Sequence, residues 1–388
     1  MIIGVPKEIL DQEGRVAAIP ETVLEYIQMG FKVAVQSAAG QGALFGDEAY
    51  SHAGAMMVED PAELFRASDV VLKVKQPWRN EAGGYHEADM IRERAVLIAF
   101  LHPAAPVNHE MVLTLARRNI TAFSMDAIPR ISRAQRMDAL TSMSTITGYK
   151  AMLIAANRFP KFIPMTGTTI GTIKAAQVLV VGAGVVGLQA IATAKRLGAP
   201  VTAVDVRDEA RKTAASLGAK IAGFEVPAEL AVGPDGRTRA LPEEWMQQER
   251  ELLEPLVQQA DIVILSALVP GEVAPLLVTE AMLGGMKPGS IIVDVAIDQG
   301  GNCGVTASGG EVSLHGVSIF GLWNIPGSMP VHGSLLYAHN VLHYVKHLFH
   351  KGLESMDLED EIIRESLVTH EGRIVHRGTL KAMGLSHA

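Results

Sequence analysis

The stretch over residues 177–207 constrains this chain more than any other, because it has the pattern of a strand, a tight glycine turn, a helix and a second strand. Its first strand, Val178–Val181, is a short apolar run of mostly β-branched residues, which is typical of a strand buried on both faces of a parallel sheet. The turn reads G-x-G-x-x-G at Gly182, Gly184 and Gly187. This order predicts a doubly wound α/β domain that binds a dinucleotide at the turn.

Each glycine has its own task in such a turn: a sharp bend, a close backbone approach to a pyrophosphate, and tight packing of the helix on the strand. Asp205, 18 residues after Gly187, would accept hydrogen bonds from an adenosine ribose and repel a 2′-phosphate. Arg207 weakens that preference without reversing it, so NAD(H) is favoured over NADP(H). The alternative is a strand-helix-strand unit whose glycines serve packing alone. The expected cofactor-binding set also includes Val185, Val186 and Val206.

The composition bounds the class of protein. A length of 388 residues favours two domains, and a formal net charge of −8 argues against nucleic acid or an anionic membrane as the main partner. The single cysteine, Cys303, excludes disulfides and cysteine-based metal sites within the chain, and we expect no metal. The longest apolar stretch, residues 175–194, fits the nucleotide-binding strand and helix better than a membrane span, and the start lacks an export signal. We therefore expect a soluble, cytoplasmic protein.

Alternating apolar runs and helical patterns predict a second parallel α/β unit in residues 1–125. Its expected strands are Ile2–Val5, Val33–Gln36, Val70–Val74 and Val96–Leu101, and its expected helices are Glu21–Met29, Ala62–Ala67 and His109–Arg118. In the second half, further strands are expected at Lys220–Ala222, Asp261–Leu265 and Ser290–Val295. Glycine and proline punctuation predicts a flexible surface loop over residues 225–255.

Near the C-terminus, a helix beyond residue 324 should return to the first domain, and a hairpin is expected around residues 370–373. His339, His343 and His347 recur every four residues and share one face of that helix. A metal site would usually need carboxylate or cysteine support, so we interpret them as a polar stripe.

Three polar residues of the first half follow strands or stand in connecting loops, where ligands bind in open α/β sheets. Arg15 offers a fork of donors suited to a carboxylate, Lys75 ends a strand before a proline, and His102 follows another strand. Taken singly, each is more often an ordinary solvated or hydrogen-bonded residue. Together with an acid further along the chain, they could hold a keto or amino acid.

The stretch PRISRAQRMDALTSMSTITGYK, which starts at residue 129, combines a polar loop with a long helix. It resembles the loop of the NAD(H)-binding component of proton-translocating nicotinamide nucleotide transhydrogenase, with Arg130, Gln135 and Asp138 at its marked positions. The resemblance implies that Arg130 and Asp138 orient the nicotinamide, that Gln135 reaches toward a partner's nucleotide, and that Thr141 replaces a common serine. A helix-capping polar loop is the plainer alternative for Asp138.

The resemblance covers nearly the whole chain and is shared with alanine dehydrogenase. The segment after residue 265 is similar in both families and would bring Ala267 and Leu268 to the nicotinamide side of the cofactor. Asp298 resembles the alanine dehydrogenase form of its loop, and Arg15, Lys75, His102 and Asp298 together match that enzyme's substrate-binding and acid/base set. The mobile loop of transhydrogenases commonly contains Gly-Tyr-Ala, and this chain has no tyrosine there.

The resemblance implies two Rossmann-like domains, residues 1–140 with 328–388 and residues 141–327, with the nicotinamide in an interdomain cleft. The implied function is the NAD(H)-binding subunit of the transhydrogenase, which passes hydride to NADP(H) on a partner. It further implies a homodimer at the inner face of the cell membrane, bound to membrane-embedded subunits. The alternatives are an NAD-dependent alanine dehydrogenase and a catalytically silent NAD-sensing scaffold.

Overall fold

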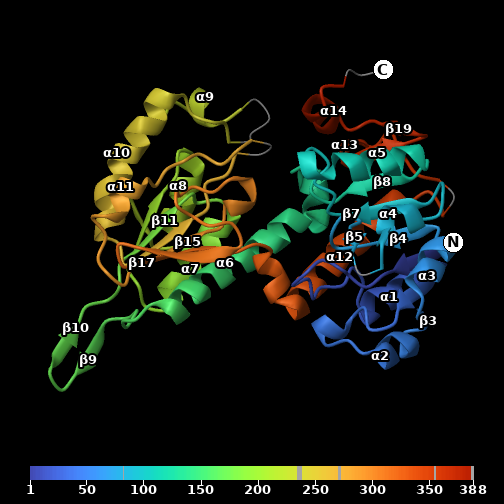
Figure 1. Cartoon of the computed structure of the whole chain (residues 1–388), viewed down its shortest axis with the longest axis horizontal. Coiled ribbons are helices and arrows are strands. Elements are labelled where there is room, and N and C mark those ends of the chain that lie inside the picture. The colour runs from blue at the N-terminus through green and yellow to red at the C-terminus, as the bar shows by residue number, and fades with distance from the viewer. Residues whose placement is uncertain (82, 234–237, 270–271, 354, 386–388) are drawn as a thin grey trace. The chain divides into compact units, whose positions relative to one another are not determined.

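The computed structural model of the chain describes residues 1–81, 83–233, 238–269, 272–353 and 355–385 (Figure 1). It divides into two compact units, Met1–Met143 with Pro326–Ala388, and Ser144–Ile325. We refer to them as unit 1 and unit 2. Each unit is built around one mostly parallel sheet, so the predicted pair of α/β domains is confirmed.

The sheet of unit 1 has the order β19-β18-β8-β7-β4-β1-β2-β3. Its parallel strands are β1 (Ile2–Val5), β2 (Lys32–Gln36), β3 (Met56–Val58), β4 (Val70–Leu72), β7 (Val96–Ala99) and β8 (Thr121–Ser124). Counted in chain order, these six strands follow the doubly wound order 3-2-1-4-5-6, which reverses direction between β1 and β4. The antiparallel strands β18 (Leu367–His370) and β19 (Arg373–Ile374) extend the sheet and form the expected hairpin.

Helices cover both faces of this sheet. They are α1 (Pro20–Gln28), α2 (Asp47–His52), α3 (Pro61–Ala67), α4 (Glu87–Met90), α5 (His109–Arg117), α12 (Pro330–Leu348), α13 (Glu361–Ser366) and α14 (Arg377–Ala382), and a small hairpin joins β5 (Arg79–Asn80) to β6 (Tyr85–His86). Residues of α4 and α5 pack with Leu97 and Ala122 on one face. On the other face, the ring of Tyr344 in α12 meets Phe123 in β8 edge-on, with centroids 5.8 Å apart. The C-terminal segment therefore completes the first fold.

The sheet of unit 2 has the order β13-β12-β11-β14-β15-β17-β16. Its strands are β11 (Val178–Val181), β12 (Val201–Val204), β13 (Lys220–Ile221), β14 (Ile262–Leu265), β15 (Ile291–Asp294), β16 (Gly310–Leu314) and β17 (Val317–Gly321), of which only β16 is antiparallel within the described sheet. The parallel strands again follow the order 3-2-1-4-5-6, so the reversal lies between β11 and β14.

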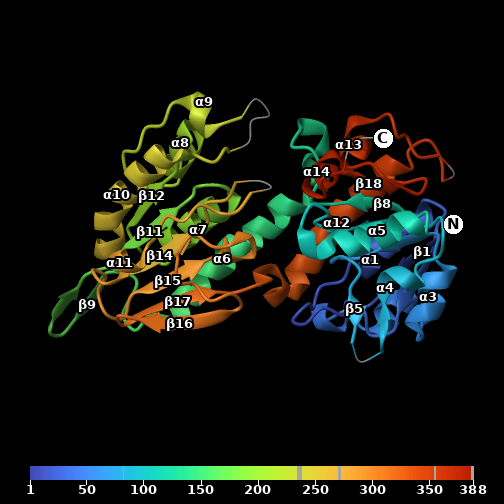
Figure 2. The ribbon, with the colours of Figure 1, turned by 45° about the horizontal axis from the view of Figure 1, so that its top comes forward.

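Alternate residues of β11 pack on opposite faces of this sheet, as the apolar run predicts. Val178 and Val180 join the core under α6 (Ala139–Arg158), α7 (Val185–Arg196) and α8 (Asp208–Ser216), whereas Leu179 and Val181 join the core under α10 (Glu243–Gln259) and α11 (Glu280–Leu283) (Figure 2). The unit also contains the short helix α9 (Ala228–Ala231) and a separate hairpin of β9 (Thr166–Thr168) and β10 (Gly171–Ile173).

The expected strands and helices of both halves are confirmed, with ends that match or differ by one or two residues. The loop expected over residues 225–255 is wrong for most of its described length, because α9 lies within it and α10 begins at Glu243. The prolines and glycines of this segment led us to predict a loop where the helix α10 lies. Its buried residues Leu253 and Val257 are one turn apart, and Pro255 lies inside the helix. Residues 234–237 of that loop lie outside the described residues. None of the described helices is long and apolar enough to cross a membrane.

A buried ion triad closes the carboxyl end of the first sheet between β1 and β4. The Lys73 ammonium, which follows β4 and is fully buried, lies 3.1 Å from Glu8 Oε2 and 2.9 Å from Glu87 Oε1. Glu8 also accepts from the Val74 N–H at 2.6 Å. Burial raises the pKa of Glu8 to about 7, although the charge of Lys73 opposes this shift. The triad therefore ties three elements together through one cation.

We predict that Lys73→Met destabilises the protein by roughly 3 kcal/mol or more at pH 8, because two buried carboxylates lose their counter-charge. Because the pKa of Glu8 is raised in the folded protein, the free energy of unfolding falls as pH rises through that pKa. The destabilisation by Lys73→Met should therefore be smaller at pH 6 than at pH 8. Urea unfolding at both pH values measures the difference. Lys32→Met, on an exposed residue, serves as the control and should change stability by no more than about 0.5 kcal/mol. A loss of equal size at both pH values would contradict the electrostatic explanation.

Candidate functional site

The glycine turn of unit 2 joins β11 to α7 and has the geometry that its sequence predicts. Gly182 has φ +88°, and a Cβ there would lie 2.7 Å from the carbonyl carbon of Ser266. A Cβ on Gly187 would lie 1.9 Å from the Gly182 carbonyl oxygen, so only glycine lets α7 pack this closely. By contrast, a Cβ on Gly184 would meet only an Arg207 nitrogen, at 3.8 Å. Gly184 therefore keeps open space beside the helix start.

The open space at Gly184 fits the pyrophosphate of a dinucleotide. Gly184 is the N-cap of the 12-residue helix α7, whose first N–H groups and dipole favour an anion at this end. Val185 and Val186, two of the expected cofactor-binding residues, form the first turn of the helix. The turn thus provides backbone donors and room where a phosphate would need both.

Asp205, the predicted ribose-binding carboxylate, follows β12 and is nearly buried. Its Oδ2 accepts from the Ala183 N–H at 2.7 Å, which fastens it to the glycine turn. The Arg207 side chain also holds it, with Nε 3.0 Å from Oδ1 and Nη2 2.9 Å from Oδ2. A ligand hydroxyl would have to share or displace the guanidinium. Val206 lies between the two residues and accepts through its carbonyl from Arg211.

Glu249, on α10, adds a second buried acid to this part of unit 2 and was not anticipated from the sequence. Burial raises its pKa to about 7, and the charge of Asp205 raises it further against a smaller opposing effect of Arg250. Glu249 is therefore a buried acid of unit 2 whose protonation is coupled to the charge of Asp205. No local sequence signal marks Glu249, because it lies in a segment that we expected to be a loop.

Two buried residues, Asp294 and Asn302, organise the loops after β14 and β15. Asn302 accepts from the Ala267 N–H at 3.0 Å and donates to the Ala267 carbonyl at 2.9 Å. Asp294 Oδ2 accepts from the N–H groups of Asn302 and Cys303, at 2.9 and 3.0 Å. Burial raises the pKa of Asp294 although these hydrogen bonds oppose it. The expected cofactor residues Ala267 and Leu268 are half-buried beside this network.

The loop predicted to orient the nicotinamide lies in unit 1 as a 3-10 turn, η3 (Ser132–Met137), followed directly by α6. Arg130 and Gln135 are exposed, and neither side chain bonds to a described residue. Asp138 instead caps α6, since its Oδ1 accepts from the Thr141 N–H at 2.8 Å and its Oδ2 from the Thr141 hydroxyl at 2.6 Å. The capping role weighed for Asp138 is thus present in the structure.

The candidate amino-acid residues of unit 1 are already engaged with acidic neighbours. Arg15 is buried and grips Glu13, with Nε 2.7 Å from Oε1 and Nη2 2.5 Å from Oε2. Burial opposes the effect, but Arg15, and to a smaller extent Lys75, lowers the pKa of Glu13 below its ordinary value. His102, at φ +43°, has its Nδ1 3.5 Å from Asp126 Oδ2. Arg15 is therefore bound to one internal acid, and His102 lies beside another.

Asp298, the fourth member of that set, belongs to unit 2. It lies on the 3-10 turn η4 (Ile297–Gln299) after β15 and is exposed. Two histidines of α12 lie beside separate carboxylates instead of sharing a site. His339 Nε2 lies 3.7 Å from Glu21, and His347 Nε2 lies 2.9 Å from Asp360. Among the described residues, no group of three or more potential ligands is placed to hold a metal.

Two sheets of order 3-2-1-4-5-6, one with a glycine turn at a helix N-terminus, define a protein of the pyridine-nucleotide dehydrogenase class. Family models support this class over almost the whole chain. The model "Alanine dehydrogenase/PNT, N-terminal domain" matches residues 4–147, and "Alanine dehydrogenase/PNT, C-terminal domain" matches residues 151–377. The chain belongs to the alanine dehydrogenase/PNT family of oxidoreductases. The family membership inferred from the loop at Arg130 is therefore confirmed.

Relatives of both kinds align over nearly their full lengths. A relative from Rhodospirillum rubrum, named as the first part of NAD(P) transhydrogenase subunit alpha, is 42% identical to this chain. The match covers 97% of this chain and 98% of the relative. The crystal structure of transhydrogenase from Sinorhizobium meliloti has a TM-score of 0.84 at 38% identity, with 97% of this chain and 100% of that chain covered. Alanine dehydrogenase of Bacillus subtilis is 32% identical over 100% of this chain and 96% of its own.

We predict that Gly184→Ala leaves the fold nearly intact and lowers the affinity for NADH by tenfold or more, because its methyl group would fill the space beside the pyrophosphate. Stability should fall by at most about 1 kcal/mol, the ordinary cost of alanine at an N-cap. Calorimetric titration and urea unfolding measure the two effects. Gly187→Ala is the matched comparison and should mainly destabilise, since its Cβ meets the Gly182 carbonyl. Unchanged NADH affinity in Gly184→Ala would contradict the location of the site.

Proposed function

We propose that this chain is the NAD(H)-binding subunit of a proton-translocating nicotinamide nucleotide transhydrogenase. NAD(H) binds to unit 2 at the glycine turn, and NADP(H) binds to a partner subunit. The proposal also takes units 1 and 2 as the functional domains of the subunit. Among the relatives described above, identity is higher with transhydrogenase subunit alpha, at 42%, than with alanine dehydrogenase, at 32%.

The single observation that carries this proposal is the display of Arg130 and Gln135 on and beside η3. Both side chains are exposed and bond to no described residue, so a ligand or a partner can engage them without breaking an internal contact. Ala134 and Met137, in the same turn, are buried and hold its backbone. A rigid turn with two free polar side chains suits a role in positioning nucleotides.

Unit 2 supplies the features that favour NAD(H) over NADP(H). Asp205 is held at the glycine turn, and a 2′-phosphate on the ribose would be repelled by its carboxylate. Arg207 moderates this preference, but its guanidinium is already neutralised by Asp205. Bound NADH supplies the hydride in the proposed reaction. The task of the chain is to hold the pyrophosphate at α7 and to exclude water, because hydride transfer needs close, dry positioning.

An NAD-dependent alanine dehydrogenase is the second candidate, and the arrangement of Arg15, Lys75 and His102 favours it. Arg15 could bind the carboxylate of pyruvate and His102 could move a proton, with Asp298 supplied by unit 2. The grip of Arg15 on Glu13 counts against this role, because a substrate carboxylate would have to displace an internal carboxylate at two hydrogen bonds.

The proposed assembly is a homodimer bound to membrane-embedded subunits, which would hold the chain at the inner face of the cell membrane. The β9–β10 hairpin offers a surface for the second copy (Figure 1). Ile170 at its tip is 93% exposed, and Met165 at its base is 69% exposed. A two-stranded hairpin with such apolar exposure is marginal in water, so burial against a second copy would stabilise it.

The proposal is tested by following NADH oxidation at 340 nm in two mixtures. With pyruvate and ammonium, the chain alone should show no turnover, although NADH binding is confirmed in the same sample. With the NADP(H)-binding partner and NADP⁺, hydride transfer should appear. Rapid turnover of pyruvate would instead establish the dehydrogenase and make His102 and Asp298 its acid/base candidates.

We predict that Gln135→Asn slows hydride transfer to the partner's NADP⁺ much more than it weakens NADH binding, because the shortened side chain no longer reaches the second nucleotide. The loss should be about tenfold or more, the scale of a misplaced positioning group. Stopped-flow transfer rates and calorimetric NADH affinity separate the two effects. An unchanged transfer rate in the reconstituted complex would remove this role from Gln135.

A further inference from the structure

The turn η3 is held from outside on both sides of Gln135, at Arg133 and at Arg136. On one side, Arg133 Nη1 donates to Asp360 Oδ2 at 3.0 Å. On the other side, Asn340 Nδ2 of α12 donates to the Arg136 carbonyl at 2.8 Å. The contacts join residues more than 200 positions apart in the chain. Gln135 is therefore placed on a segment that the C-terminal residues of unit 1 fix.

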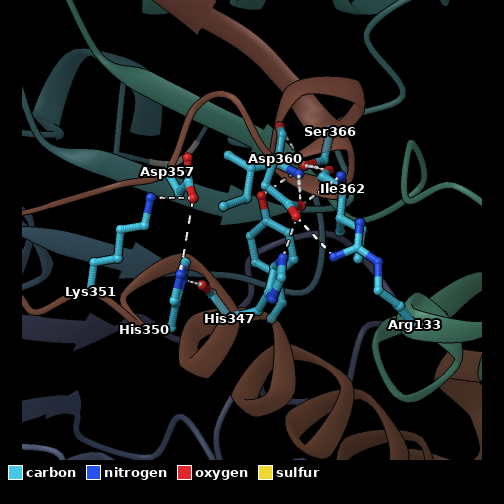
Figure 3. A network of polar contacts seen from close by, with 10 residues as sticks. Arg133, His347, His350, Lys351, Asp357, Asp360, Ile362 and Ser366 are labelled. Atoms are coloured by element: carbon cyan, nitrogen blue, oxygen red, sulfur yellow. Dashed lines mark hydrogen bonds and ion pairs between the residues drawn. The ribbon is translucent and has the colours of Figure 1, made fainter.

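The Asp360 carboxylate gathers donors from three elements (Figure 3). Its Oδ1 accepts from the Ile362 N–H at 2.8 Å, at the start of α13, and from His347 Nε2 of α12 at 2.9 Å. Burial opposes ionisation, but the hydrogen bonds from His347 and Arg133 hold the pKa of Asp360 well below its usual range. The carboxylate is ionised, so His347 Nε2 is the donor in this contact.

The remaining anchors of η3 are apolar. Ala134 is 1% exposed and Met137 is 7% exposed, and both press the turn against unit 1 without fixing a direction. The Arg133 side chain is itself 56% exposed, so the Asp360 contact contributes little to global stability. The contact between Arg133 and Asp360 is directional and charge-assisted, and it orients the backbone that carries Gln135.

We propose that Asp360, acting through Arg133, is a positioning residue that sets the orientation of Gln135 for hydride transfer. The inference rests on the proposed function and extends it to a residue that touches neither nucleotide. Asp360 holds Arg133 from the cap of α13, and His347 keeps the carboxylate aimed at the turn.

Asp357 provides a matched control only three residues away. It is also a partly buried carboxylate, and the hydrogen bond from Lys351 most strongly lowers its pKa against a smaller effect of burial. Lys351 Nζ lies 2.5 Å from its Oδ2, and His350 Nε2 lies 4.0 Å away (Figure 3). Both partners lie just beyond the end of α12, and neither belongs to η3. Asp357→Asn therefore removes a comparable ion pair without releasing the turn.

The test compares Asp360→Asn with Asp357→Asn in the complex reconstituted with the NADP(H)-binding partner. Asparagine at 360 can still accept from the Ile362 N–H, but its amide group cannot serve both the cap and Arg133. Hydride transfer at saturating NADH should fall about tenfold in Asp360→Asn, with NADH affinity within about twofold of the parent. Asp357→Asn should transfer at the parent rate. Equal rates in the two variants would overturn the proposal.

A double-mutant cycle gives a sharper criterion. Arg133→Gln alone should slow transfer as much as Asp360→Asn, and the two changes together should cost no more than either one. Additive losses would overturn the proposal, because they would mean that the two residues act separately.

Hydrogen exchange of the free chain separates this inference from the proposed function. Amides of residues 131–138 should exchange faster in Asp360→Asn than in the parent, and Asp357→Asn should match the parent. If the parent complex transfers no hydride to NADP⁺, the proposed function fails, and the exchange result alone then decides whether Asp360 holds the turn. Unchanged exchange in Asp360→Asn would overturn the proposal.

Discussion

The reversal of strand order between β1 and β4, and again between β11 and β14, is the constraint on which both halves of the molecule depend. At each reversal the two connections leave the sheet in opposite directions, which opens a crevice at the carboxyl ends of the strands. Unit 1 closes it with charge, through Lys73 between Glu8 and Glu87. In unit 2 the backbone lines it, through the close approach of Gly182 to Ser266 and a hydrogen bond from the Ser266 hydroxyl to the Gly182 carbonyl at 2.8 Å. The same strand order therefore has side chains packed at the strand ends in unit 1 and a candidate nucleotide site at the strand ends in unit 2.

Several groups that the sequence marks as ligand-binding are already bonded inside the chain. Asp205 holds Arg207, Arg15 holds Glu13, and Asp138 holds Thr141. Binding at these groups would exchange one hydrogen bond for another, so each contributes to selectivity and geometry more than to net affinity. The exposed side chains of Arg130 and Gln135 differ in this respect, because their engagement breaks no hydrogen bond or ion pair with the described residues. This contrast favours a function in which η3 meets a nucleotide or a partner from outside.

The nucleotide-binding half was readily predicted, because its evidence is local. Strand, glycine turn, helix and acid lie within residues 177–207, and each step of the pattern has a separate physical reason. The residues that stabilise the candidate site could not be found in this way. Asn302 clamps the loop at Ala267 and is itself held by Asp294 at the end of β15, and Asp360 reaches Arg133 across 227 positions. Helix α10 was missed for a different reason, since turn-forming residues before it outweighed its short apolar stripe.

The capping contact of Asp138 has a consequence for how the protein could register a bound nucleotide. Both carboxylate oxygens are committed to Thr141, one to its backbone N–H in the first turn of α6 and one to its hydroxyl. A ligand that drew this carboxylate away would leave that N–H unsatisfied, and the helix would fray at its first turn or begin later in the chain. Occupancy would then be recorded as a change in the length of α6. A polar contact at one residue would become a mechanical signal carried by a 20-residue helix.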